Sequence, residues 1–224
     1  MASGRDPLAA KPGGLSAPLS PAGEKAWQIT IDLAERLFVL IIFANFVVVI
    51  SHTLGVRPYN ALALISEGLV VFFILIRRSA KAVTIRPWDW FIALAGTTLA
   101  MFVRAGGKPY APEIFGTCLM FAGILLAIAA KLTLRKSFGV AAANRGAVIS
   151  GPYRFVRHPM YAGYVLVYAG FFLNNPSPWN IAIYIATLAL LVARIFAEEG
   201  VLDRDPVYAA YKARVHYRLV PGVV

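Results

Sequence analysis

Two short polar segments of the chain carry the residue types that could do chemistry. The first, residues 151–163, holds an arginine pair, a histidine and two tyrosines between long apolar runs. The second follows the last apolar run and contains Arg194, Glu198, Glu199, Asp203, Arg204 and Asp205. Polar groups are costly near hydrocarbon, so such clusters at the boundary of a span are candidate sites. We expect the two segments to meet and form one ligand site.

The adjacent acids Glu198 and Glu199 lie at the end of an expected helix, where carboxylates oppose the helix dipole. Arg194 precedes Glu198 by four residues and can pair with it along the helix. Glu199 points about 100° away from Glu198 and is not explained by that pair. A cationic ligand group is therefore the partner that we expect for at least one of the two acids, with an ordinary intrahelical pair as the alternative.

His158 and Pro159 mark the start of a helix. Proline disfavours helix at the preceding residue and makes Met160 an early helical position. The free N–H groups of such a helix start favour an anion or a hydrogen-bond acceptor. An ordinary helix start with a snorkelling Arg157 is the alternative interpretation.

The composition indicates a membrane protein. The chain has 224 residues, of which 59% are hydrophobic and 15% charged, whereas soluble domains are roughly a quarter charged. The net charge of +11 comes from Lys and Arg that lie between apolar runs, so we expect no nucleic-acid binding. Cys118 is the single cysteine, which excludes an internal disulfide and a cysteine metal cluster, and we expect no metal site.

Six apolar stretches predict an all-α fold, a polytopic membrane helical bundle. They cover residues 29–50, 61–76, 88–103, 114–130, 160–173 and 179–196. The fifth stretch is short, so five spans with a re-entrant fifth segment is the alternative. Residues 174–179 predict a tight turn between the last two helices.

Lysine and arginine positions predict the orientation of the bundle. With the N-terminus inside, all but Arg57, Arg104 and Lys108 of the 22 basic residues face the cytoplasm. The positive-inside rule then places both termini in the cytoplasm, and both polar segments at the same membrane face. We expect an integral protein of the bacterial inner membrane.

The chain divides into three expected regions. Residues 1–24 are rich in Ala, Gly, Pro and Ser and predict a disordered tail without the apolar core of a signal peptide. Residues 25–130 form the first transmembrane helices, and residues 131–224 carry both polar segments and a C-terminal cytoplasmic cap.

Glu67 is a lone acid within the second span, and we expect it to pair with a basic side chain or to contact substrate. Asp32, Glu35 and Arg36 suggest a self-paired entrance to the first span.

Several catalytic motifs are absent from the sequence. There is no G-x-G-x-x-G after a strand, no G-x-x-x-x-G-K-[ST], no G-x-S-x-G and no H-E-x-x-H. Their absence excludes a soluble Rossmann-type domain, a conventional serine hydrolase and a zincin.

The combined pattern of the C-terminal half resembles the isoprenylcysteine carboxyl methyltransferase family, and bacterial members and related phospholipid N-methyltransferases share this half. It consists of Gly151-Pro-Tyr-x-x-x-Arg-His-Pro-x-Tyr-x-Gly163, Arg194-x-x-x-Glu-Glu199, Tyr208-x-x-Tyr211 and Arg218-x-x-Pro221, preceded by Leu134-Arg-Lys-Ser-Phe-Gly139. The resemblance covers about residues 130–221, whereas residues 1–110 show no comparable match.

The resemblance implies an integral methyltransferase that holds S-adenosylmethionine at the cytosolic ends of the last helices, under a C-terminal cap. The cofactor-binding residues that it implies are Tyr153, His158, Pro159, Tyr161, Gly163, Glu198, Glu199, Tyr208, Tyr211 and Arg218. The catalytic residues that it implies are Arg157, Arg194 and Glu198. The methyl acceptor is a lipophilic small molecule or a lipidated substrate that enters from the bilayer and carries a carboxylate, as in a prenylcysteine, or an amine or thiol. The oligomeric state is left open.

Two other functions fit parts of this pattern. An NADPH-dependent membrane reductase of the sterol or steroid type also carries an Arg-His-x-x-Tyr-x-Gly stretch, but the Glu198-Glu199 pair favours the methyltransferase. A non-catalytic membrane scaffold or lipid-binding protein is the third interpretation.

Overall fold

The computed structural model describes residues 21–55, 60–78, 80, 82–84, 86–140 and 142–222. The chain divides after Ala34 into two compact units, and the bundle discussed below belongs to the second, Glu35–Val224. The first 20 residues of the expected tail lie outside the described residues, and the first helix begins at Pro21.

Every apolar stretch forms a helix. The helices are α1 (Pro21–Leu54), α2 (Asn60–Ile76), α3 (Pro87–Thr98), α4 (Glu113–Leu134), α5 (Pro159–Asn174) and α6 (Pro178–Leu202), followed by the short α7 (Pro206–Arg214). Within the described residues the connections include three 3-10 turns: η1 (Leu99–Phe102), η2 (Arg135–Ser137) and η3 (Gly151–Arg154). The all-α prediction omitted one small feature, the antiparallel pair β1 (Ala82–Val83) and β2 (Ala143–Asn144).

Three helices in the described part of the chain are long and apolar enough to cross a membrane: Ile29–His52, Glu113–Ser137 and Pro178–Leu202. Helix α2 is apolar but shorter, and α5 has 16 residues, fewer than the roughly 20 that a perpendicular span requires. The length and composition of the helices therefore support membrane integration but do not confirm the count of six spans.

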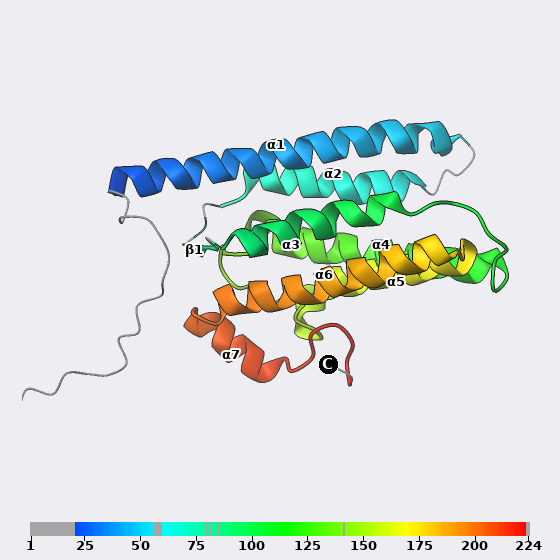
Figure 1. Ribbon diagram of the computed structural model, residues 1–224. Helices are drawn as coiled ribbons and strands as arrows, with labels where there is room; N and C mark the ends of the chain where they lie inside the picture. Colours follow the sequence, from blue (N-terminus) through cyan, green and yellow to red (C-terminus); the bar gives the residue numbers. More distant parts are fainter. Residues whose placement is uncertain are drawn as a thin grey trace, which may run out of the picture. The chain divides into compact units, whose positions relative to one another are not determined.

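The helices of the second unit alternate in direction, and this alternation brings the two polar segments together. Figure 1 shows the end of α4, the start of α5, the end of α6 and all of α7 at the same end of the bundle. Residues 151–163 and 194–205 therefore lie at one end, as the sequence predicted.

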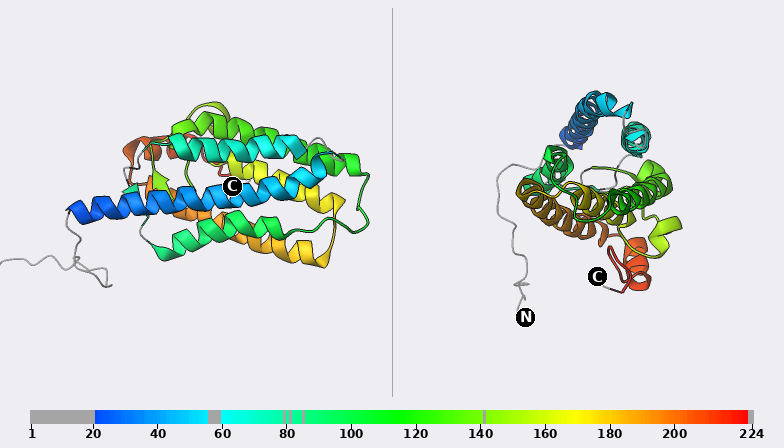
Figure 2. Two further views of the ribbon diagram at one scale, coloured as in Figure 1. Left: turned by 90° about the horizontal axis from the view of Figure 1, so that it is seen from above. Right: turned by 90° about the vertical axis from the view of Figure 1, so that its right-hand side faces the viewer.

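Helices α4 and α5 pack closely along their length, and α3 packs against α6 (Figure 2). Glycine makes the α4–α5 approach possible. A Cβ on Gly163 would lie 2.6 Å from the carbonyl oxygen of Gly123, and a Cβ on Gly123 would lie 2.6 Å from that of Gly163. Small residues at such a contact let two backbones approach in a membrane, where packing rather than water exclusion holds helices together.

Candidate functional site

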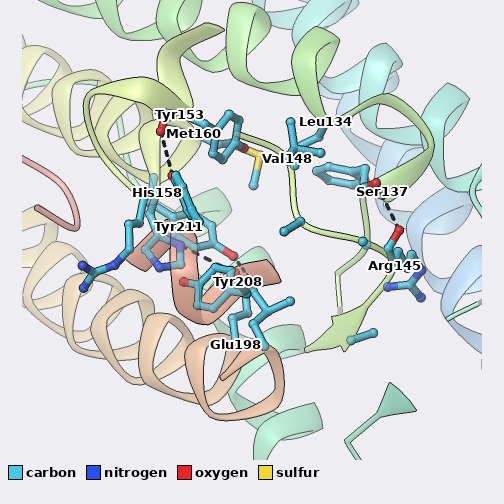
Figure 3. A pocket seen from close by; sticks show the side chains of 18 residues that line it. Leu134, Ser137, Arg145, Val148, Tyr153, His158, Met160, Glu198, Tyr208 and Tyr211 are labelled. Atoms are coloured by element: carbon cyan, nitrogen blue, oxygen red, sulfur yellow. Dashed lines mark hydrogen bonds and ion pairs between the residues drawn. The ribbon is translucent and has the colours of Figure 1, made fainter. Parts of the chain in front are cut away.

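A pocket with a cavity volume of about 100 Å³ lies where these helix ends meet. Its walls come from the end of α4, the loop of residues 138–148, η3, the start of α5, the end of α6 and α7 (Figure 3). The side chains that line it are Leu134, Ser137, Phe138, Ala143, Arg145, Ala147, Val148, Tyr153, Arg157, His158, Met160, Tyr161, Glu198, Leu202, Tyr208 and Tyr211, together with Gly139 and Gly146.

Local sequence fixes the start of α5 beside this pocket. Pro159 is the first helical residue, and His158 before it has the non-helical angles φ −127° and ψ 60°. This arrangement agrees with the prediction, because the proline ring excludes helix at the residue before it. His158 is buried and reaches both acids: its Nε2 lies 3.3 Å from an oxygen of Glu199 and its Nδ1 lies 3.8 Å from an oxygen of Glu198.

Glu198 faces the pocket and is held from two sides. Its Oε1 accepts a hydrogen bond from the hydroxyl of Tyr161 and another, at 3.2 Å, from Nε of Arg194. The Arg194 guanidinium also lies 5.3 Å from the centre of the Tyr161 ring. The expected pair between Arg194 and Glu198 is therefore present, and it orients the carboxylate without removing it from the pocket wall.

Glu199 is buried beneath the pocket wall and is surrounded by cations of the chain itself. Arg157 donates from Nε to Oε1 at 2.8 Å, and Arg218 approaches Oε2 at 3.1 Å. We expected a ligand cation as the partner of at least one of the two acids, but at Glu199 the protein itself supplies the cations. Partners 42 and 19 positions away in the chain could not be read from helical spacing.

The segment that follows α7 closes over the start of α5. The backbone N–H groups of Arg157 and His158 donate to the carbonyls of Tyr217 and Arg218 at 2.9 and 2.8 Å. Arg157 also donates from Nη1 to the carbonyls of Val215 and His216, each at 2.8 Å. Residues 215–218 thus run along residues 157–158, and Arg157 joins this segment to Glu199.

Three tyrosines form a buried wall of the pocket. The Tyr211 hydroxyl donates to the carbonyl of Tyr153 at 2.7 Å (Figure 3). Burial raises the pKa of Tyr211 to about 12 and raises the pKa values of Tyr153 and Tyr208 above their ordinary range, so all three are neutral near pH 7. The hydroxyl of Tyr208 is buried and has no hydrogen-bond partner among the described residues. Such a group indicates a ligand or a water beside it.

A comparison with known families identifies this part of the chain. Residues 111–209 match the phospholipid methyltransferase family. That family belongs to the same group as the isoprenylcysteine carboxyl methyltransferases, so the resemblance drawn from the motifs is confirmed. The match supports a membrane methyltransferase. No curated protein matches the chain.

The phospholipid methyltransferase segment carries most of the pocket, from α4 to the first residues of α7. Of the residues that the sequence suggested, seven line the pocket: Tyr153, Arg157, His158, Tyr161, Glu198, Tyr208 and Tyr211. Five do not: Pro159, Gly163, Arg194, Glu199 and Arg218. Gly163, a cofactor-binding residue by the resemblance, faces α4, because the close approach of the two helices leaves no room for a side chain there.

Several residues in the walls of this pocket were not predicted from the sequence. Phe138 and Gly139 belong to a stretch noted only as part of the resemblance, and Arg145 was counted only as a topogenic charge. Met160 and Val148 are ordinary apolar residues whose direction depends on packing. The residue types at these positions did not indicate that they would line the pocket.

Glu67 pairs with a basic side chain, which was one of the two roles expected for it. Nζ of Lys131 lies 2.9 Å from Oε1 of Glu67 and donates to the hydroxyl and the carbonyl of Ser66 at 2.9 and 3.0 Å. Lys131 is fully buried and also lies 5.2 Å from the centre of the Tyr164 ring.

Proposed function

We propose that the protein is an integral-membrane methyltransferase that uses S-adenosylmethionine and acts on a lipophilic acceptor. The observation that carries this proposal is the pocket within the family segment, where His158 and Tyr161 from one polar segment meet Glu198 from the other. The family match supports the methyl transfer, and the apolar helices support a membrane setting for the acceptor.

The types of residue that line the pocket fit the chemical groups of S-adenosylmethionine. Leu134, Phe138, Val148 and Met160 offer an apolar surface for a purine ring. Glu198 offers a carboxylate to an ammonium group or to ribose hydroxyls, and the Tyr208 hydroxyl is open to a further hydrogen bond. We assign these roles to the residues of the pocket wall.

The cavity volume of about 100 Å³ is smaller than the roughly 300 Å³ at which ligand pockets begin. Admission of the cofactor therefore requires the walls to move apart. The walls that no transmembrane helix carries are the 138–148 loop, η3 and α7. We assign the opening to them.

When bound, the cofactor would supply a methyl group on a sulfonium, and transfer of this group to a carboxylate or thiolate neutralises charge, so a dry site favours it. The chain contributes alignment and exclusion of water. Tyr161 and Arg194 fix the carboxylate of Glu198, and the buried tyrosines keep the wall dry. Alignment of reactants is worth up to about 7–11 kcal/mol in ideal cases.

The acceptor determines whether a base is required. A carboxylate or thiolate acceptor reacts as it stands, whereas an ammonium acceptor must first lose a proton. His158 lies between Glu198 and Glu199 and borders the pocket, so it is the residue that we assign as base for an amine acceptor.

The proposed setting is a membrane bundle of six spans, or five with a re-entrant α5, with both termini and the pocket on the cytoplasmic side. In this orientation all but Arg57, Arg104 and Lys108 of the 22 basic residues would lie on the cytoplasmic side, as the positive-inside rule requires. In a bacterium this places the protein in the inner membrane, with the soluble cofactor entering from the cytoplasm and the acceptor from the bilayer.

Titration of the purified protein in detergent with S-adenosylmethionine tests the cofactor, with NADPH titrated in parallel. We expect saturable binding of S-adenosylmethionine and none of NADPH. Binding of NADPH alone would instead favour the membrane reductase. Mass spectrometry of membrane lipids incubated with methyl-labelled cofactor, with and without the protein, then identifies the acceptor class.

A further inference from the structure

Glu35 of α1 contacts Val140, which follows the pocket-lining Phe138 and Gly139, although Glu35 lies far outside the phospholipid methyltransferase segment. Its side chain is buried, and its Oε1 accepts a hydrogen bond from the backbone N–H of Val140 at 2.7 Å. The same oxygen accepts from Nη1 of Arg77, just after α2, at 2.6 Å. The acid thus joins two N-terminal helices to the 138–148 loop.

Val140 links this acid to the residues of the site. Its own carbonyl accepts a hydrogen bond from Nη2 of Arg194 at 2.7 Å, and Arg194 donates from Nε to Glu198 at 3.2 Å. Phe138 and Gly139, the two residues before Val140, line the pocket. A continuous set of hydrogen bonds therefore runs from Glu35 through Val140 and Arg194 to Glu198.

Stability alone gives a weak reason for a charged group in this place. Replacement of a buried ion pair by apolar side chains of similar volume is often neutral or stabilising. An apolar pair at positions 35 and 77 would fill the same space, but it could not accept the hydrogen bond of the Val140 N–H. The role that requires a hydrogen-bond acceptor at position 35 is the placement of the 138–148 loop.

We propose that Glu35 is a positioning residue for the ligand pocket, which it serves by holding Val140 and, through Arg194, the carboxylate of Glu198. This inference depends on the proposed function, because its readout is the binding of S-adenosylmethionine. The positioning uses an acid from the N-terminal region, which the family match does not cover.

The test compares variants of the full-length protein by isothermal titration with S-adenosylmethionine and by thermal unfolding. The double variant Glu35→Met/Arg77→Met removes both members of the ion pair together and removes the acceptor for Val140. Glu35→Gln retains a carbonyl acceptor. Glu113→Gln changes an exposed acid in the first turn of α4 and serves as the control.

We expect the double variant to unfold near the wild-type temperature and to bind S-adenosylmethionine about tenfold more weakly, the usual scale for one lost hydrogen bond. Glu35→Gln should bind within about threefold of wild type, and Glu113→Gln should not differ. If the double variant does not fold, Glu35→Asp, which keeps the charge but is one methylene shorter, should show the tenfold loss instead.

The positioning role would be overturned if the double variant bound S-adenosylmethionine as tightly as wild type. If the double variant does not fold, the same result in Glu35→Asp would overturn it. Either result would leave the proposed function intact. Absence of binding by the wild-type protein would instead remove the proposed function itself. The two failures are therefore distinguishable in one set of titrations.

Discussion

Two neighbouring carboxylates have different environments in this protein. Glu199 is 3% exposed and is paired with Arg157 and Arg218, whereas Glu198 borders the pocket beside Tyr161. The sequence singled out both acids but did not separate their roles. Helical spacing does not specify which face of the helix packs against the rest of the chain.

Substitution of these acids should separate folding from binding. Glu199→Gln leaves Arg157 and Arg218 without their buried counter-charge and should cost about 3–5 kcal/mol of stability. Glu198→Gln should leave the unfolding temperature near wild type and weaken S-adenosylmethionine binding at least tenfold. Thermal unfolding and titration of both variants provide the measurement, and equal effects of the two changes on both quantities would contradict the assignment.

The tyrosines of the pocket wall allow a matched comparison of hydroxyl groups. Tyr208→Phe removes a hydroxyl without a partner in the described chain, so stability should be unchanged while cofactor affinity falls about five- to tenfold. Tyr211→Phe removes the hydrogen bond to the Tyr153 carbonyl and should cost about 1 kcal/mol of stability. A stability loss in Tyr208→Phe that matches that of Tyr211→Phe would argue against a ligand role for the Tyr208 hydroxyl.

At the scale of elements, the sequence predicted the helices well and their contacts poorly. The apolar stretch predicted at 160–173 forms α5, Pro159–Asn174, and the His158-Pro159 start is confirmed. The contact of Glu35 with Val140 was not predicted, and neither was Lys131 as the basic partner of Glu67, although a basic partner was one of the two roles expected for this acid. Such pairs depend on the rotation of whole helices about their axes, which an apolar stretch without a polar face does not specify.

The α4–α5 contact gives a prediction about element packing. Gly163→Ala places a Cβ 2.6 Å from the Gly123 carbonyl, so the helices must separate and the pocket wall at the start of α5 must shift. We expect a loss of 1–3 kcal/mol, the usual cost of overpacking, and weaker cofactor binding. The control is Gly200→Ala in α6, where nothing lies within 4 Å of the added Cβ. That change should be neutral or stabilising, because alanine favours helix over glycine.

At the scale of the whole molecule, the proposed topology can be tested by labelling. In a Cys118→Ser background, a cysteine at position 108 should react with an impermeant maleimide from outside intact cells. A cysteine at position 214, in α7, should react only after the cells are opened. Labelling of position 214 in intact cells would contradict a cytoplasmic pocket and the orientation inferred from the basic residues.

The central claim is that the pocket at the polar end of the bundle binds S-adenosylmethionine. Isothermal titration of the purified wild-type protein, alongside Glu198→Gln, tests it directly. The account predicts saturable binding by the wild type and at least tenfold weaker binding by the variant. No binding by a folded wild-type protein at millimolar cofactor, or equal binding by the two proteins, would contradict it.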